Sequence, residues 1–146
     1  SMQPTHATSD MPWAEARVGA ERIRGAYAWQ TLLKLDVPLA LGSDFPVERV
    51  APTLGLYAAI ARQDQDGQPP GGWFPDQRLS RAEALHGFTL AAAHAGFAEA
   101  EIGSLEPGKR ADYTLFAAAP YTAPISDLAS LKVLGTWIDG ERVSGE

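Results

Sequence analysis

The chain has 146 residues, of which 45% are hydrophobic and 21% charged, with a net charge of −6 and a pI near 5.0. This composition is typical of a globular domain with a moderate core and excludes a disordered chain. The acidic balance argues against a nucleic-acid partner, and no apolar run approaches the roughly 20 residues of a membrane span. The absence of cysteine excludes disulfides and thiolate metal sites. Because no signal-like segment is visible, we take the cytoplasm as the default location.

The first quarter of the chain predicts a polar, turn-rich start and then a broken helix. Residues 1–12 hold the turn-forming residues, and a helical region then runs to about Lys34. Gly19 and Gly25 predict breaks within it. The expected inward face consists of apolar side chains: Tyr27, Leu32 and Leu33, with Trp29 at its edge.

The stretch VPLALGSDFPVE, residues 37–48, predicts a short buried strand that ends in a turn. Val37–Leu41 is apolar without alternation, which favours a strand buried on both faces. The apolar run stops at Gly42, Ser43 and Asp44. A carboxylate in this place either closes the turn or is presented as a metal ligand or proton acceptor, and the stretch by itself leaves both open.

The middle of the chain predicts helices on either side of a loop. Pro52 opens a helix that fades after Arg62. Residues 63–78 form a loop with one Trp-Phe pair, which indicates either a lid or interface, or a loop anchored to its own core. A capping box over Ser80–Glu83 then opens a helix to Ala95, which Gly96 is expected to end in a left-handed cap.

The last part of the chain predicts exposed-type strands. Ala111–Phe116 alternates as a strand does, and Asp139-Gly140 is typical of a two-residue hairpin turn between 136–138 and 141–143. One buried parallel-type strand cannot form a sheet alone, so the strand over residues 37–41 needs neighbours from sequence not present here or from another chain. The chain is therefore predicted to be a piece of a larger α/β protein.

Five stretches occur in an order that resembles a known family: QPTHATSDMPWAEARVGAERIRGAYAW, LALGSDFPVE, LSRAEALHGFTLAAAHAGF, IGSLEPGKRADYTLF and VLGTWIDGERV. Together they are similar to the C-terminal third of a metal-dependent amidohydrolase, in the branch around N-substituted formamide deformylases. The resemblance implies an α/β fold, a (β/α)8 TIM barrel with a small β-sandwich built from both chain ends. Residues 1–100 would then be the last part of the barrel, and residues 101–146 the C-terminal part of the sandwich.

The resemblance also assigns candidate site residues. Residues 1–6 would end barrel strand seven, and residues 37–44 would form strand eight, with Asp44 as its catalytic and metal-site aspartate. Catalytic groups of barrel enzymes sit at the carboxyl ends of strands, where a carboxylate can accept the proton of a metal-activated water. His6 is expected to contact the substrate as a pocket residue. Arg62 is a candidate for binding a substrate carboxylate, although an ordinary ion-pair role is open for it too.

The family's other metal ligands are absent from this sequence. An HxH pair on strand one and single histidines on strands five and six would lie upstream, and one aspartate with one histidine falls short of the three protein ligands of a catalytic zinc site. We therefore expect the full-length parent to hold a divalent metal, zinc in the first instance. The isolated chain is expected to bind no metal tightly and to be inactive.

The sequence leaves two functions open. The first is part of a hydrolase that acts on the C–N bond of a small amide or formamide substrate. The alternative is a non-enzymatic assembly or interaction module derived from an amidohydrolase. In either case open strand edges favour self-association, so the chain is expected to be oligomeric or partly disordered in about its first 35 residues.

Overall fold

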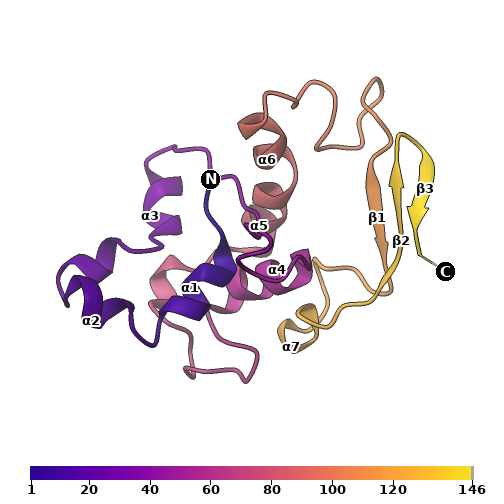
Figure 1. The fold of residues 1–146 in the computed structure, drawn as a ribbon. Helices are drawn as coiled ribbons and strands as arrows, with labels where there is room; N and C mark the ends of the chain where they lie inside the picture. Colours follow the sequence, from indigo (N-terminus) through magenta and orange to yellow (C-terminus); the bar gives the residue numbers. More distant parts are fainter. Residues whose placement is uncertain (146) are drawn as a thin grey trace.

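Helices dominate the N-terminal part of the chain, and a small sheet forms near its C-terminus (Figure 1). The computed structural model describes residues 1–145. The helical elements are α1 (Pro4–Asp10), α2 (Ala14–Val18), the 3-10 turn η1 (Arg22–Gly25), α3 (Trp29–Lys34), α4 (Pro52–Ala61), the 3-10 turn η2 (Pro75–Gln77), α5 (Arg81–Phe88), α6 (Leu90–Ala95) and α7 (Ile125–Leu128). The strands are β1 (Tyr113–Phe116), β2 (Val133–Ile138) and β3 (Glu141–Ser144).

Helix α4 lies at the centre of the helical part. It is apolar on all sides, with residues 53–61 all buried, as expected for a helix that is surrounded by other elements. Helices α1, α5 and α7 pack against it. Pro52 occupies its first turn, where the missing N–H leaves no hydrogen bond unmade, and this start confirms the helix predicted from the sequence.

The first 35 residues differ from the prediction in two places. Residues 4–10 form α1 instead of turns, because Pro4 starts the helix and Thr5 and Ala7 are buried against the core. The hydroxyl of Tyr27 donates a hydrogen bond to the Asp10 carboxylate and so ties the end of this helix to the chain before α3. Trp29, predicted at the edge, is fully buried in the core. The breaks predicted near Gly19 and Gly25 are confirmed.

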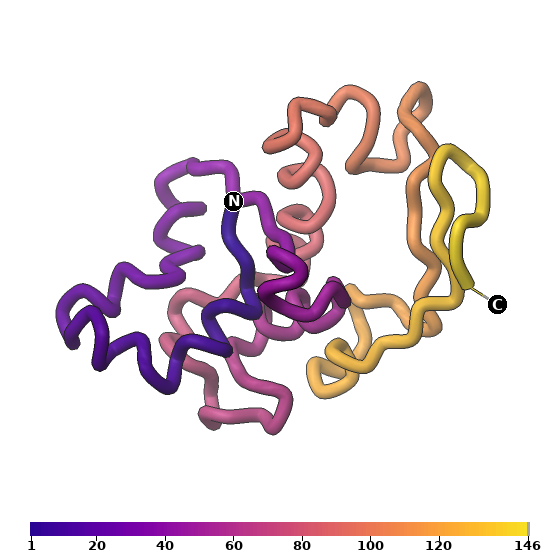
Figure 2. The backbone as a smooth tube through the Cα atoms, viewed as in Figure 1, coloured from indigo at the N-terminus to yellow at the C-terminus, as the bar shows by residue number. Residues whose placement is uncertain are grey.

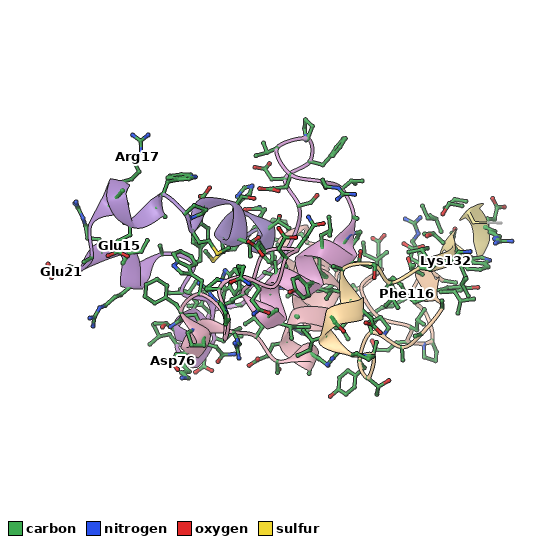
Figure 3. All side chains as sticks on the ribbon, turned by 90° about the horizontal axis from the view of Figure 1, so that it is seen from below. Glu15, Arg17, Glu21, Asp76, Phe116 and Lys132 are labelled. Atoms are coloured by element: carbon green, nitrogen blue, oxygen red, sulfur yellow. The ribbon has the colours of Figure 1, made fainter. Side chains whose placement is uncertain are left out.

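The region around α2 is solvated. The side chains of Glu15, Arg17 and Glu21 project from α2 and the following turn into open space (Figure 3). Among the described residues, no helix has the length and the apolar character needed to cross a membrane.

The prediction of a regular strand over residues 37–41 is wrong. Only Leu41 pairs, in a single parallel bridge with Met2. On its other side the Leu41 N–H donates to the Gly87 carbonyl at 2.9 Å, so a residue of α5 occupies the edge where a neighbouring strand would pair. A buried parallel strand needs a neighbouring strand on each edge. Within the described residues, the segment 37–41 has a strand-like partner only at Leu41, so no regular strand forms.

The helix predicted over residues 80–95 forms as two helices. Its capping box is confirmed, since the Glu83 N–H donates to Ser80 Oγ and the Ser80 N–H donates to the Glu83 carboxylate. Thr89 interrupts the helix, with φ −123° and ψ −96°. The left-handed cap expected at Gly96 is also wrong, because Gly96 has φ −92° and Phe97 takes the positive φ instead.

The C-terminal sheet has the order β1-β2-β3 and is antiparallel throughout. It stands at the opposite end of the molecule from α2 (Figure 2). The Asp139-Gly140 turn is confirmed, with φ of 53° and 80°, and the Gly140 N–H donates to the Ala111 carbonyl at 3.0 Å. Every residue of β3 is exposed, so the sheet has little cover on either face.

Gly140→Val tests this hairpin. A β-branched residue is strained at a φ of 80°, and we expect the free energy of unfolding to fall by about 1–2 kcal/mol or more. Gly140→Asn is the matched variant, because asparagine tolerates the left-handed region, and it should be less destabilised than Gly140→Val. Thermal melts of the unmodified chain, Gly140→Asn and Gly140→Val give the order of their stabilities. Equal melting temperatures for all three would show that the turn does not depend on glycine.

Gly87→Ala tests the contact between α5 and the residue 41 segment. A Cβ at Gly87 would lie 2.6 Å from Leu41 Cδ1 and 2.7 Å from Leu41 Cγ. Overpacking of this kind destabilises by about 1–3 kcal/mol, which outweighs the helix propensity of about 1 kcal/mol that alanine gains. Gly25→Ala is the control, since nothing lies within 4 Å of its Cβ. Denaturant unfolding in which Gly87→Ala is as stable as Gly25→Ala would contradict this packing.

Candidate functional site

The site is built on the parallel pairing of two short extended segments. The Met2 N–H donates to the Ala40 carbonyl at 2.9 Å, and the Gly42 N–H donates to the Met2 carbonyl at 3.2 Å. Because the two segments run parallel, the residues that follow them emerge at the same edge. Those residues are the first turn of α1, which carries His6, and the turn that begins at Asp44.

His6 and Asp44, the two predicted site residues, meet at this edge. His6 Nε2 lies 3.8 Å from Asp44 Oδ2, which is within ion-pair range and too long for a hydrogen bond. The imidazole is 23% exposed and the carboxylate 55% exposed. Within residues 1–145, His6 Nε2 is a buried atom that has no hydrogen-bond partner. Within residues 1–145, neither His6 Nε2 nor the Asp44 carboxylate makes a hydrogen bond.

The backbone of Asp44 closes a turn while its side chain stays free. Asp44 has a φ of 55°, a left-handed conformation that aspartate tolerates better than most residues. Its carbonyl accepts from the Val47 N–H at 2.8 Å, and the Phe45 N–H donates to Ser43 Oγ at 3.3 Å. No residue in 1–145 donates a hydrogen bond to the Asp44 carboxylate. Asp44 can therefore close the turn with its backbone and still present its carboxylate as a metal ligand or proton acceptor.

Arg62, the third predicted site residue, lies elsewhere and is 1% exposed. It ends α4 in the left-handed region, with a φ of 51°. Its Nη1 donates to the Tyr27 carbonyl at 2.9 Å, and its Nε donates to the Trp73 carbonyl. The guanidinium carbon lies 4.4 Å from the ring centroid of Trp29 and 5.2 Å from that of Trp73. These contacts are structural, and the substrate role of Arg62 stays a prediction that this burial does not favour.

Burial, and then the positive charge of Arg78, lower the pKa of Arg62 from its ordinary value to about 10. Arg62 is still protonated at neutral pH, so the fold holds a buried cation between two indole rings and two backbone carbonyls. The Trp73 N–H also donates to the Arg62 carbonyl at 2.8 Å. Arg62 therefore anchors the loop 63–78 to the core, which is one of the two interpretations open for that loop.

The described residues supply only part of a metal centre. No group of three or more His, Cys, Asp or Glu side chains that could hold a metal is present in residues 1–145. The donors of His6 and Asp44 do suit a divalent metal, since imidazole nitrogen and carboxylate oxygen are both common zinc ligands. The unpartnered Nε2 beside a free carboxylate is the observation that supports this fit.

Comparison with known proteins decides the family. The sequence profile described as "Amidohydrolase family" matches residues 1–144. The chain belongs to this family. The resemblance identified from the sequence is thereby confirmed.

Relatives of this amidohydrolase chain are longer proteins. It is 34% identical over 147 residues to Protein LONG AFTER FAR-RED 3 of Arabidopsis thaliana, covering 98% of this chain and 24% of that protein. It is 33% identical over 111 residues to the N-substituted formamide deformylase of Arthrobacter pascens, covering 76% of this chain and 20% of the deformylase. The chain thus spans a fifth to a quarter of the length of these relatives.

A solved structure shares both sequence and fold with this chain. An uncharacterized metal-dependent hydrolase from Pyrococcus horikoshii OT3 superposes with a TM-score of 0.74 at 32% identity, over 85% of this chain and 25% of that protein. The metal dependence is a property of that hydrolase. The likeness supports the same arrangement of backbone elements in the amidohydrolase chain described here.

Arg62→Met tests the anchoring role of Arg62. The substitution keeps much of the side-chain length but leaves the Trp73 carbonyl without its side-chain donor and removes one of the two donors of the Tyr27 carbonyl, so we expect a loss of about 2–4 kcal/mol in the free energy of unfolding. Arg24→Met, at an exposed position of η1, should change stability by no more than about 0.5 kcal/mol. Denaturant titration compares them, and an Arg62→Met variant as stable as Arg24→Met would contradict the anchoring role.

Proposed function

We propose that this chain forms the C-terminal part of a metal-dependent amidohydrolase barrel and supplies one edge of its active site. In this proposal the paired segments around Met2 and Leu41 are the ends of barrel strands seven and eight, followed by α1 and by the turn at Asp44. Residues 1–100 complete the barrel, and residues 101–146 join the sandwich. The parallel bridge between Met2 and Leu41 is the observation that carries it, because it has the direction that neighbouring barrel strands require. The family match supports the same proposal.

The proposed chemistry is hydrolysis of a C–N bond. Asp44 acts as the general base and acid: its free carboxylate accepts a proton from the attacking water and delivers it to the leaving nitrogen. His6, 3.8 Å from that carboxylate, orients it or the substrate from the neighbouring strand end. A divalent metal held by Asp44 with ligands from the rest of the longer protein would supply Lewis-acid activation of water and carbonyl. Zinc is the metal we propose, on the donor types.

The proposed substrate class is a small amide or formamide. One relative, at 33% identity, is named as an N-substituted formamide deformylase. We propose that the longer protein to which this chain corresponds acts on the same kind of bond. In the absence of the remaining ligands, the isolated chain is proposed to be inactive and to bind no metal tightly.

Asp44→Asn in the longer protein tests this role. The substitution keeps the size and the left-handed turn but removes the base, so kcat should fall by roughly 10²–10⁴ with the metal retained. Asp36→Asn is a matched control, because Asp36 also has a positive φ, at 56°, in an exposed turn. It should leave kcat unchanged. Full turnover by Asp44→Asn with stoichiometric metal would rule out Asp44 as the base.

The alternative function, an assembly module, is favoured by the open sheet. Leu115, Ile138 and Val143 are each about half exposed, and both edge strands of the sheet lack an outer partner among the described residues. Exposed edges and apolar area recruit other chains. The hydrolase proposal accounts for the same surface through the missing part of the longer protein.

Sedimentation velocity with metal analysis of the 146-residue chain tests the open surface. Because the sheet and its edges are uncovered, we expect oligomers, with no tightly held metal. A well-ordered monomer with one equivalent of zinc would contradict the proposal, since that result requires a complete site within this chain.

A further inference from the structure

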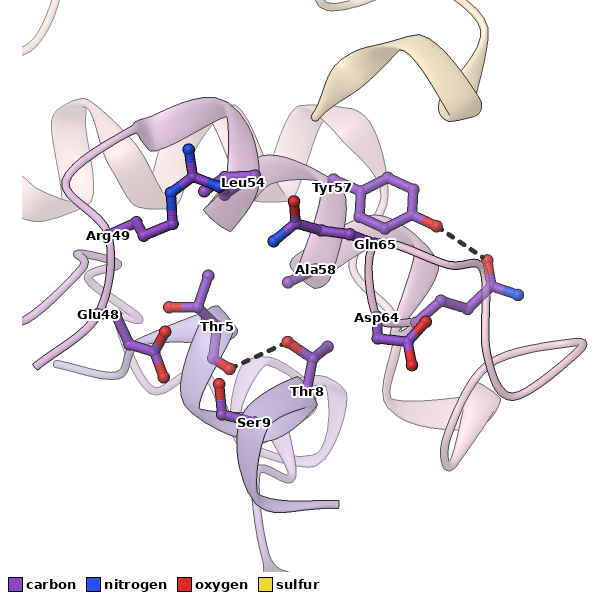
Figure 4. Close-up of a pocket in the computed structure, with 11 residues that line it drawn as sticks. Thr5, Thr8, Ser9, Glu48, Arg49, Leu54, Tyr57, Ala58, Asp64 and Gln65 are labelled. Carbon is purple, nitrogen blue, oxygen red and sulfur yellow. Dashed lines mark hydrogen bonds between the residues drawn. The ribbon is translucent and has the colours of Figure 1, made fainter. Parts of the chain in front are cut away.

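A cavity of about 140 Å³, lined by both polar and apolar side chains, lies between α1, α4 and two connecting segments. In Figure 4 the side chains around it come from α1, from the residue 48–49 turn, from α4 and from residues 63–65. The hydrolytic chemistry proposed above uses none of these side chains. Since a water molecule takes about 30 Å³ in the liquid, the cavity has room for a molecule of a handful of non-hydrogen atoms.

Two opposite charges at this cavity lack partners in the fold. Glu48 and Arg49 are neighbours in sequence, yet neither makes an ion pair or a side-chain hydrogen bond within residues 1–145. Figure 4 shows both side chains bordering the same space, with Glu48 beside Thr5 and Arg49 above it. The cavity therefore presents a separate anion and a separate cation that the protein itself does not neutralise.

A buried hydroxyl at the same cavity also lacks a partner. Thr5 lines the cavity and is 9% exposed, and its Oγ1 is buried without a hydrogen-bond partner in the described part of the chain. Thr8, one turn further along α1, donates to the Thr5 carbonyl at 3.0 Å. Leaving a buried hydroxyl unsatisfied is unfavourable, so such atoms in native proteins call for an explanation such as a bound molecule.

Tyr57 closes another side of the cavity. Its hydroxyl donates to Gln63 Oε1 at 3.4 Å, a long and weak hydrogen bond. Burial, and then the negative charge of Asp64, raise the pKa of Tyr57, so this hydroxyl stays a donor at neutral pH. The lining thus offers a cation, an anion and neutral hydroxyl groups.

We propose that this cavity binds a small zwitterion that carries both an ammonium and a carboxylate group and is about the size of a small α-amino acid. Arg49 binds the carboxylate as a charge-assisted donor, and Glu48 accepts from the ammonium. The Thr5 hydroxyl gains its missing partner from the same molecule. This proposal uses none of the side chains assigned to the hydrolytic chemistry, so a failure of either proposal leaves the other standing.

Amide NMR shifts of the 146-residue chain, titrated with L-alanine, test the site. Acetate and methylammonium serve as probes that each carry one of the two charges. L-alanine should shift the amides of residues that line the cavity in a saturable way, and each single-charge probe should bind about tenfold or more weakly. The same titration is repeated on Arg49→Gln and Glu48→Gln, for which the Kd of L-alanine should rise about tenfold.

Matched variants separate binding from folding. Arg24→Gln and Glu21→Gln make the same charge changes at exposed positions away from the cavity and should leave the Kd unchanged. Thr5→Val keeps the side-chain shape and removes the unsatisfied hydroxyl, so it should weaken L-alanine binding while the melting temperature stays the same or rises. No saturable shift up to about 0.1 M L-alanine, where even weak small ligands are detected, would overturn the proposal. Equal binding of acetate, or equal loss in the control variants, would overturn it too.

Discussion

The candidate active site depends on one backbone pairing, the parallel bridge between Met2 and Leu41. His6 and Asp44 are 38 residues apart in the sequence, from residue 6 to residue 44, and the two hydrogen bonds of the Met2 residue bring their segments side by side. The Leu41 N–H on the other edge is satisfied by the Gly87 carbonyl. Because Gly87 has no side chain, α5 can approach the segment closely enough for this bond. The extended segment that leads to Asp44 is therefore held on both sides, by Met2 and by Gly87.

A second constraint comes from the buried cation of Arg62. Its contacts tie the end of α4 and the loop 63–78 that follows it to the chain around Tyr27 and Trp29, which is distant in sequence. Burying a charge is unfavourable unless it is partnered, and here two carbonyls and two indole faces offset part of that cost, while Nη2 has no hydrogen-bond partner within residues 1–145. The residues that follow Arg62 line the cavity beside α1, so the same anchor places one wall of the proposed zwitterion site.

Local sequence signals predicted the local structures well. Asp139-Gly140 predicted the hairpin because its two residues tolerate positive φ, and Ser80 with Glu83 predicted the helix start because both bonds of the capping box are made within four residues. The errors lie where tertiary contacts decide. The segment 37–41 has strand composition but lacks partners for a ladder, and the predicted helix over residues 80–95 divides at Thr89.

The site could be predicted in part. Asp44 and His6 were found through the family resemblance, which gives each a strand end, but their approach to 3.8 Å depends on the pairing of residues 2 and 41. The burial of Arg62 had no signal in the sequence, because an arginine at a helix end is usually exposed. Thr5, Glu48 and Arg49 were missed as a group, since no motif marks residues that meet around a cavity only after folding.

We propose that the edge carrying Asp44 is part of a metal-dependent hydrolase active site. The decisive experiment is a crystal structure of the longer amidohydrolase that contains this chain, grown with zinc. We expect a zinc ion at this edge with an Asp44 carboxylate oxygen at about 2.0–2.2 Å, the usual zinc–carboxylate distance. A zinc ion bound elsewhere, with the Asp44 carboxylate turned to bulk solvent and remote from the metal, would refute the assignment of Asp44.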